Sequence, residues 1–175
     1  MELTIAHLYP DSMSLYGEYA NVAVLRRKLE AMGVEVSVRR FTCEDILDFS
    51  GVDFIYMGAG TEKRQKGVLI AAPNYAPALK AAVEGGAVLL FTGNAMETLG
   101  ASVTDAAGKV WPGYGLADFT TVETDRRDPG DVVAASGRWD APAVGFMNTC
   151  SLTRGVTAPL FKELRLGFGN EAEHG

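Results

Sequence analysis

Residues 88–100, VLLFTGNAMETLG, have the form of a site for nucleophilic chemistry. The apolar run VLLF predicts a strand, the glycine after it indicates a sharp turn, and the remainder predicts a short helix start closed by Leu-Gly. A tight strand-to-helix turn of this kind, a nucleophile elbow, holds a reactive side chain above a parallel sheet. The turn residues here are Thr92, Gly93 and Asn94, so neither a cysteine nor a serine stands at the turn. We therefore expect the frame of a catalytic site without its usual attacking atom.

Thr92 is the one hydroxyl nucleophile that the elbow offers. A lone threonine is inert without a positioned base. Its more ordinary role at this position is to end the strand.

A second chemical feature is the turn Gly58-Ala59-Gly60, which follows the apolar residues 52–57. Glycines leave backbone N–H groups uncovered near a helix start, where they can form an oxyanion hole or an anion cradle. The plainer interpretation, a tight strand-to-helix turn, produces the same pattern, and both stay open.

The elements that position these turns alternate between strand and helix over the first hundred residues. Short apolar runs predict strands, and apolar residues at helical spacing predict helices. The predicted strands are residues 3–8, 34–41, 52–57 and 87–91, and the predicted helices are 21–32, 62–70 and 77–84. This alternation is typical of an α/β fold with a parallel sheet covered on both faces. Ligands bind such sheets beyond the carboxyl ends of the strands, which the turns 7–17, 58–65 and 92–96 reach.

The pattern changes after Gly100. Short strand candidates cover residues 119–124, 132–135, 143–147 and 164–168, and turn signals at 128–130 and 136–137 separate them. This half predicts antiparallel β structure that extends the parallel core. Without an internal repeat or linker, residues 1–175 form one predicted domain.

Composition narrows the function. The net charge of −6 disfavours binding to nucleic acid or to an anionic membrane, because both need a basic face. Cys43 and Cys150 lie far apart and show no CxxC spacing, so we expect no disulfide framework, metal site or cofactor, and a reducing cytoplasm fits. No apolar stretch approaches the length of a membrane span, so we expect no membrane insertion.

Several segments in order carry a resemblance to a known family: IAHLYPDSMSLYGEYANVAVLRRKLE, DFIYMGAGTEKRQ, VLLFTGNAMETLG, GYGLADFTT, RRDPGD and GFMN. The chain resembles class I glutamine amidotransferase domains of the cobyric acid synthase (CobB/CobQ) type. Within that group it is most similar to the glutaminase subunits that act in lipid II amidation in peptidoglycan synthesis. The resemblance implies a flavodoxin-like three-layer fold whose parallel sheet is extended by antiparallel strands.

The resemblance also implies a mechanism. An elbow cysteine attacks the side-chain amide of glutamine, a histidine acts as base and acid, and backbone N–H groups hold the oxyanion. The released ammonia goes to a Mur-ligase-like amidoligase partner. The family's elbow resembles Cys-Gly-Gly-Tyr-Gln-x-Leu-Gly, and anchoring it on Leu99-Gly100 places the nucleophile at Gly93; a slip of one residue gives Thr92 or Asn94.

Other positions of the family pattern are present. Gly58, Ala59 and Gly60 fit the oxyanion turn, and Arg64-Gln65 match the segment that follows it. Arg127 matches the arginine that would hold the α-carboxylate of glutamine, for which a planar guanidinium is suited. The alternative for Arg127 is a solvated, charged turn.

The two histidines, His7 and His174, match no catalytic position of the family. We expect a packing or turn-capping role for His7 and a chain that lacks the family's last strand and catalytic histidine. Three hypotheses follow. The sequence favours an amidotransferase-like pseudoenzyme; the others are an active glutaminase with a displaced nucleophile and a flavodoxin-like small-molecule binder.

Overall fold

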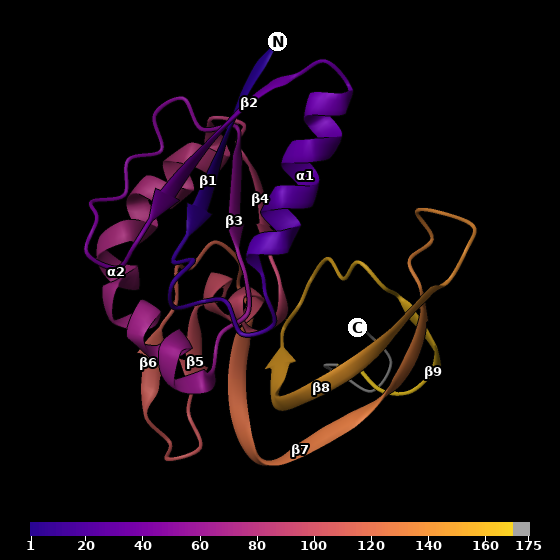
Figure 1. Ribbon diagram of the computed structural model, residues 1–175. Coiled ribbons are helices and arrows are strands. Elements are labelled where there is room, and N and C mark those ends of the chain that lie inside the picture. Colours follow the sequence, from indigo (N-terminus) through magenta and orange to yellow (C-terminus); the bar gives the residue numbers. More distant parts are fainter. Residues whose placement is uncertain (170–175) are drawn as a thin grey trace.

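The computed structural model describes residues 1–169 and contains two sheets, one all parallel and one mostly antiparallel (Figure 1). The first sheet has the strand order β2-β1-β3-β4. Its elements are β1 (Glu2–Leu8), α1 (Tyr19–Ala31), β2 (Glu35–Phe41), β3 (Phe54–Met57), α2 (Glu62–Glu84) and β4 (Val88–Phe91). These four strands and helix α1 lie where the apolar patterns predict them.

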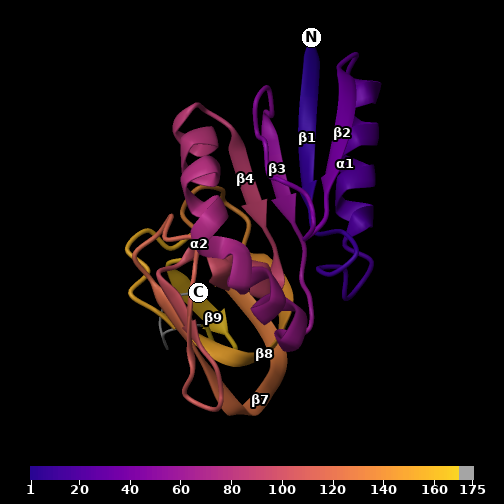
Figure 2. The ribbon, with the colours of Figure 1, turned by 90° about the vertical axis from the view of Figure 1, so that its left-hand side faces the viewer.

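Helices α1 and α2 cover opposite faces of the parallel sheet (Figure 2). Each face has its own core, because alternate residues of a strand point to opposite sides. Ala6 and Leu8 of β1 belong to the core on the α2 side, whereas Ile5 packs with Val22 of α1. The predicted three-layer α/β architecture is confirmed.

Helix α2 corrects one prediction, since residues 62–84 form one helix and not two. Pro73 and Pro77 lie inside it, and both are exposed. A proline has no N–H group to donate to the carbonyl four residues earlier, so each of these prolines removes one hydrogen bond from the helix. Meanwhile Leu69, Ala72 and Leu79 keep one apolar stripe against the sheet, which holds the helix together.

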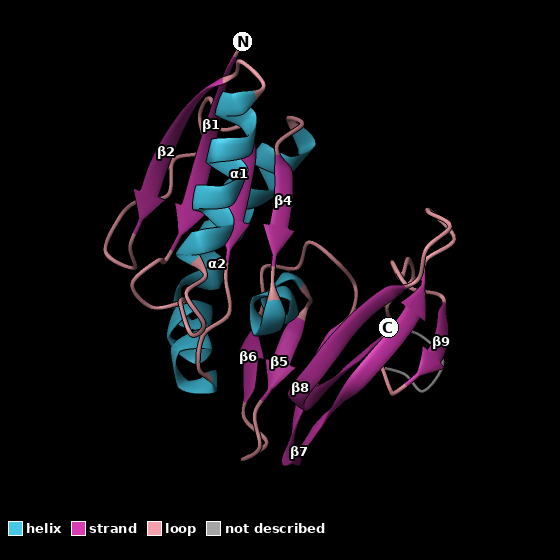
Figure 3. Cartoon of the chain, turned by 45° about the vertical axis from the view of Figure 1, so that its right-hand side comes forward, coloured by secondary structure: helices cyan, strands magenta, loops and turns pink. Residues whose placement is uncertain are grey.

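The second sheet contains the antiparallel half that the sequence predicts, hydrogen-bonded separately from the first (Figure 3). Its strands are β5 (Ser102–Thr104), β6 (Val110–Pro112), β7 (Thr120–Ala135), β8 (Ala143–Arg154) and β9 (Glu163–Leu166). The short hairpin β5–β6 was not predicted. The β5–β7 pair is parallel and the other pairs are antiparallel.

Strand β7 corrects a second prediction. The sequence Asp-Pro-Gly at 128–130 indicates a turn, but β7 continues through these residues without ending. The ladder with β8 shifts register between residues 123 and 128, and the two strands form a strongly bent ribbon (Figure 1). Directly after this irregularity, Asp128, Pro129 and Gly130 pair with Thr149, Asn148 and Met147, so pairing with β8 continues through the proline and glycine. The predicted turn at Ser136-Gly137 is confirmed, with Gly137 at a φ of 72°.

Within residues 1–169, no helix combines the length and the apolar character needed to cross a membrane.

His7, at the end of β1, is a buried titratable residue. Its side chain is buried, its Nε2 atom has no hydrogen-bond partner among residues 1–169, and its ring packs 5.4 Å from that of Tyr56. This placement fits the expected packing role. Burial, aided by the positive charge of Arg40, lowers the pKa of His7 to about 4.

We predict that the free energy of unfolding falls as the pH drops from 6.5 towards 4. In that window the unfolded chain takes up a proton on His7 and the native chain does not. The expected loss between pH 7 and pH 5 is about 1–2 kcal/mol. Urea unfolding of the wild type and of His7→Phe at both pH values measures it, and equal pH dependence in the two proteins contradicts the prediction.

Candidate functional site

The candidate site lies at the carboxyl ends of β1, β3 and β4, where the parallel sheet meets β7 and β8 (Figure 3). A cavity of about 280 Å³ opens there. Its lining comes from both halves of the chain: Leu15, Tyr16, Ala59, Gly60, Glu62, Gly93, Asn94, Met96, Glu97, Glu123, Arg127, Phe146, Met147, Asn148, Thr149, Cys150, Ser151 and Thr153. The predicted location of the site at this edge is therefore matched by a cavity.

The elbow itself has the predicted shape. Strand β4 ends at Phe91, Thr92 precedes a 3₁₀ helix η1 (Gly93–Leu99), and Gly93 has a φ of 57°. A positive φ at Gly93, two residues after the end of the strand, gives the sharp turn that an elbow requires. Gly93 lines the cavity, so the position that the family pattern assigns to the nucleophile carries no side chain.

The hydroxyl of Thr92 lies outside the cavity lining. It is 3.1 Å from the hydroxyl of Tyr56 and 3.4 Å from Oε2 of Glu18. Tyr56 also donates to Glu18 and accepts from Asn21, so this buried polar group is satisfied within the α1 side of the sheet. Thr92 thus has the strand-ending position and hydrogen-bond partners of its own.

Close packing explains both glycines of the 58–60 turn. A Cβ atom on Gly58 would lie 2.3 Å from Cβ of Glu18, and one on Gly60 would lie 2.5 Å from Sδ of Met13. The turn then leads into α2, whose first turn is capped by the Thr61 hydroxyl accepting from the N–H of Arg64. Close packing alone is therefore enough to explain why glycine stands at these two positions.

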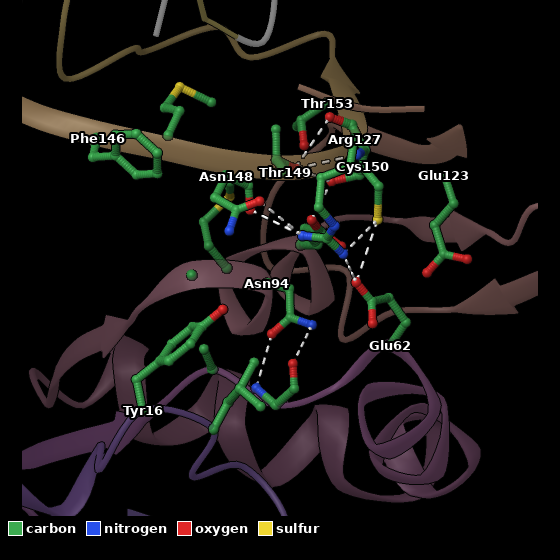
Figure 4. Close-up of a pocket in the computed structure, with 18 residues that line it drawn as sticks. Tyr16, Glu62, Asn94, Glu123, Arg127, Phe146, Asn148, Thr149, Cys150 and Thr153 are labelled. Carbon is green, nitrogen blue, oxygen red and sulfur yellow. Dashed lines mark hydrogen bonds and ion pairs between the residues drawn. The ribbon is translucent and has the colours of Figure 1, made fainter. Parts of the chain in front are cut away.

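Asn94 joins the elbow to this glycine turn (Figure 4). Its side-chain oxygen accepts the N–H of Gly60 at 3.0 Å, and its side-chain nitrogen donates to the Gly60 carbonyl at 2.8 Å. The Gly60 N–H, one of the predicted oxyanion donors, is therefore already bound by the chain's own carboxamide.

Gln65 and Arg64 have different surroundings although they are adjacent. Gln65 is fully buried and donates to the carbonyl of Asn94 at 2.6 Å and to Glu97 at 2.7 Å. Arg64 is exposed, lies outside the cavity lining and donates to the carbonyl of Asp11 at 3.1 Å. The structure places Gln65 behind the elbow and Arg64 at the surface loop before α1.

Arg127, on β7, does line the cavity. Its guanidinium donates to Oε1 of Glu62 at 2.5 Å, to the carbonyl and side-chain oxygens of Asn148 at 3.2 and 3.3 Å, and to Sγ of Cys150 at 3.3 Å (Figure 4). Both side chains of the Arg127–Glu62 pair are 45% exposed to solvent. A ligand carboxylate reaching Arg127 would compete with Glu62 for the same guanidinium.

Cys150 is the residue that the sequence patterns missed. It lies on β8, lines the cavity, and its thiol donates to Oε1 of Glu62 at 3.3 Å. Nothing in the chain's local sequence marks it, because only the β7–β8 ribbon brings it beside α2. Burial, then the hydrogen bond to Glu62, raises the pKa of this thiol, so it is protonated and weakly nucleophilic near neutral pH. Cys43, by contrast, is exposed after β2.

The lining divides into two ends. Tyr16 and Phe146 lie on one side in Figure 4, and Glu62 and Glu123 lie on the other.

No group of three or more histidine, cysteine, aspartate or glutamate side chains within residues 1–169 is arranged to hold a metal ion. His174 lies outside the described residues.

Comparison with known proteins defines the class. A family model described as the CobB/CobQ-like glutamine amidotransferase domain matches residues 4–167, and the chain belongs to this family. The chain is similar to the lipid II isoglutaminyl synthase (glutamine-hydrolyzing) subunit GatD of Staphylococcus aureus (strain N315), with 27% identity over 172 residues, which cover 98% of this chain and 70% of that protein. It is also similar to the subunit of the same name from Streptococcus pneumoniae (strain ATCC BAA-255 / R6), with 27% identity over 148 residues, or 84% of this chain and 57% of the relative.

The two hydrogen bonds between the Asn94 side chain and the backbone of Gly60 lead to a stability prediction. Asn94→Ala removes two hydrogen bonds and leaves the Gly60 peptide group without these partners, which should cost about 1–3 kcal/mol of unfolding free energy. Chemical denaturation measures the loss. Asn74→Ala, on the exposed face of α2, is the matched control and should change little. Equal effects of the two substitutions would contradict the assigned role.

The Cys150 environment yields a reactivity prediction. At pH 8 iodoacetamide should alkylate Cys150 more slowly than Cys43, because the Cys150 thiolate is disfavoured. Glu62→Gln should speed alkylation of Cys150, because it removes the carboxylate that accepts the thiol proton while Arg127 remains. Peptide mass spectrometry follows both cysteines in one sample, with Cys43 as internal control. An unchanged or slower rate at Cys150 in Glu62→Gln argues against the assigned contact.

Proposed function

We propose that this protein is an amidotransferase-like subunit that works with a Mur-ligase-like amidoligase and does not itself hydrolyse glutamine. Family membership supports the first part, and the two GatD relatives, named as subunits of lipid II isoglutaminyl synthase, favour lipid II in peptidoglycan synthesis as the amidated acceptor. A cobyric-acid-type acceptor is the alternative within the same family.

The observation that carries the proposal is Gly93 at the elbow. The backbone has the positive φ of a nucleophile position, but the residue there has no side chain. The Gly60 N–H, which would stabilise an oxyanion, is occupied by Asn94. Hydrolysis of an amide by this route needs both an attacking atom and free donors where charge develops.

Binding of glutamine without hydrolysis is compatible with the same cavity. Arg127 offers a guanidinium to an α-carboxylate, and Glu62, its present partner, is close enough to meet an α-ammonium group. In this role the subunit would signal to the ligase that glutamine is bound, or would stabilise the ligase. We place this activity in the cytoplasm, a location that the two free cysteines fit.

The test is release of glutamate from glutamine by the purified chain, alone and with its ligase partner. We predict release at the level of the buffer control, whereas a GatD subunit of the staphylococcal kind, named as glutamine-hydrolyzing, is the positive control. Isothermal titration with glutamine in the same preparation shows whether the cavity is folded and binds. Rapid glutamate release overturns the proposal.

An active glutaminase with a displaced nucleophile is the second candidate, and Cys150 is the observation that favours it. Its thiol faces the same cavity within 3.3 Å of both Glu62 and Arg127. If glutamate is released, Cys150→Ser should abolish it and Cys43→Ser should not. Release that survives both substitutions and ends with Thr92→Val assigns the reaction to the threonine instead.

A further inference from the structure

The elbow and the glycine turn approach each other closely at Ala59 and Gly93. A Cβ atom built on Gly93 would lie 2.8 Å from Cβ of Ala59. Two Cβ atoms at van der Waals contact are about 3.5–4.0 Å apart, so a methyl group at 59 and any side chain at 93 compete for one volume.

Movement of the glycine turn cannot relieve this clash cheaply. Gly58 and Gly60 already approach Glu18 and Met13 so closely that neither has room for a Cβ atom. The carbonyl of Ala59 accepts the N–H of Leu15 at 2.9 Å, which ties the turn to the loop before α1.

The elbow is held equally firmly from its own side. The N–H of Thr92 donates to the carbonyl of Met57 at 3.0 Å, and the side chain of Asn94 binds both backbone groups of Gly60. Buried Gln65 donates to the Asn94 carbonyl at 2.6 Å. Gly93 therefore lies between Thr92 and Asn94, and hydrogen bonds hold both of these residues in place.

We propose that Ala59 is the positioning residue that keeps the elbow free of a side chain, so that a nucleophile at 93 requires the loss of the Ala59 methyl group. A single Gly93→Cys substitution would not build a usable elbow thiol, whereas Ala59→Gly with Gly93→Cys would. The interpretation of position 93 as an emptied nucleophile site rests on the proposed function; the steric exclusion between residues 59 and 93 does not.

The test is a double-mutant cycle in a Cys43→Ser, Cys150→Ser background, which leaves one thiol. Thermal unfolding compares the background, Ala59→Gly, Gly93→Cys and the pair. We expect Gly93→Cys to lower the melting temperature by about 3–10 °C, the range for overpacking in a chain of this size. Ala59→Gly should restore most of that loss. Gly93→Ala, which adds the Cβ alone, should show the same loss and the same rescue.

Gly51 supplies the matched control. It has a φ of 68° and no atom within 4 Å of a built Cβ, so Gly51→Cys carries the cost of a positive φ without the clash. Gly51→Cys should lower the melting temperature less than Gly93→Cys, and Ala59→Gly should not rescue it. Failure of rescue at 93, rescue at 51, or equal losses at 93 and 51 would each overturn the proposal.

Alkylation by iodoacetamide then reports where the new thiol points. The sulfur forms a bond to the methylene carbon, iodide leaves, and the thiol proton goes to solvent. The folded Ala59→Gly, Gly93→Cys variant should be fully labelled, since position 93 lines an open cavity. A folded but unreactive double variant overturns the proposal. If Gly93→Cys fails to fold while the pair folds, the proposal stands; if neither folds, it falls. None of these readouts depends on glutamine turnover.

Discussion

The structure depends on a buried hydrogen-bond network centred on Gln65. Its amide nitrogen donates to the Asn94 carbonyl and to Glu97, and its amide oxygen accepts from Lys66. The hydroxyl of Ser151 on β8 donates to Glu97, and Lys66 forms an ion pair with Glu123 on β7. Within residues 1–169 the two sheets share no strand ladder, and this network links the elbow to the β7–β8 ribbon.

Burial gives the network its importance. Gln65 is fully buried, and Glu97 is 7% exposed. Desolvation by burial raises the pKa of Glu97, and the hydrogen bonds from Ser151 and Gln65 oppose that rise. Losing any one partner would leave a buried polar group unsatisfied, which costs far more than an exposed hydrogen bond contributes. The same groups therefore hold part of the cavity lining in place and determine how the two halves of the chain pack together.

Sequence patterns predicted the parallel sheet and its edge turns because each depends on local periodicity and on glycines in forced conformations. Gly93 is an example: its place after an apolar run predicted a sharp turn, and the structure shows a φ of 57° there. Strand β7 shows the opposite case. Its Asp-Pro-Gly reads locally as a turn, and pairing with β8 overrides it. Continuous α2 is similar, because its apolar stripe outweighs two exposed prolines.

The site was predictable only in part for the same reason. Arg127 could be placed from its motif, but its pairing with Glu62 and Cys150 arises from the meeting of α2, β7 and β8, which no local pattern records. Glu62 looks like an ordinary first-turn helix residue, and Cys150 like a small apolar strand residue.

These contacts bear on how the elbow is held with a glycine at position 93. In a working site the oxyanion donors and the carboxylate-binding guanidinium stay open for substrate. Here Asn94 binds the Gly60 N–H, and Glu62 binds Arg127. Each internal partner satisfies a group that an empty active site would leave strained or exposed. The frame is thus held by contacts within the chain.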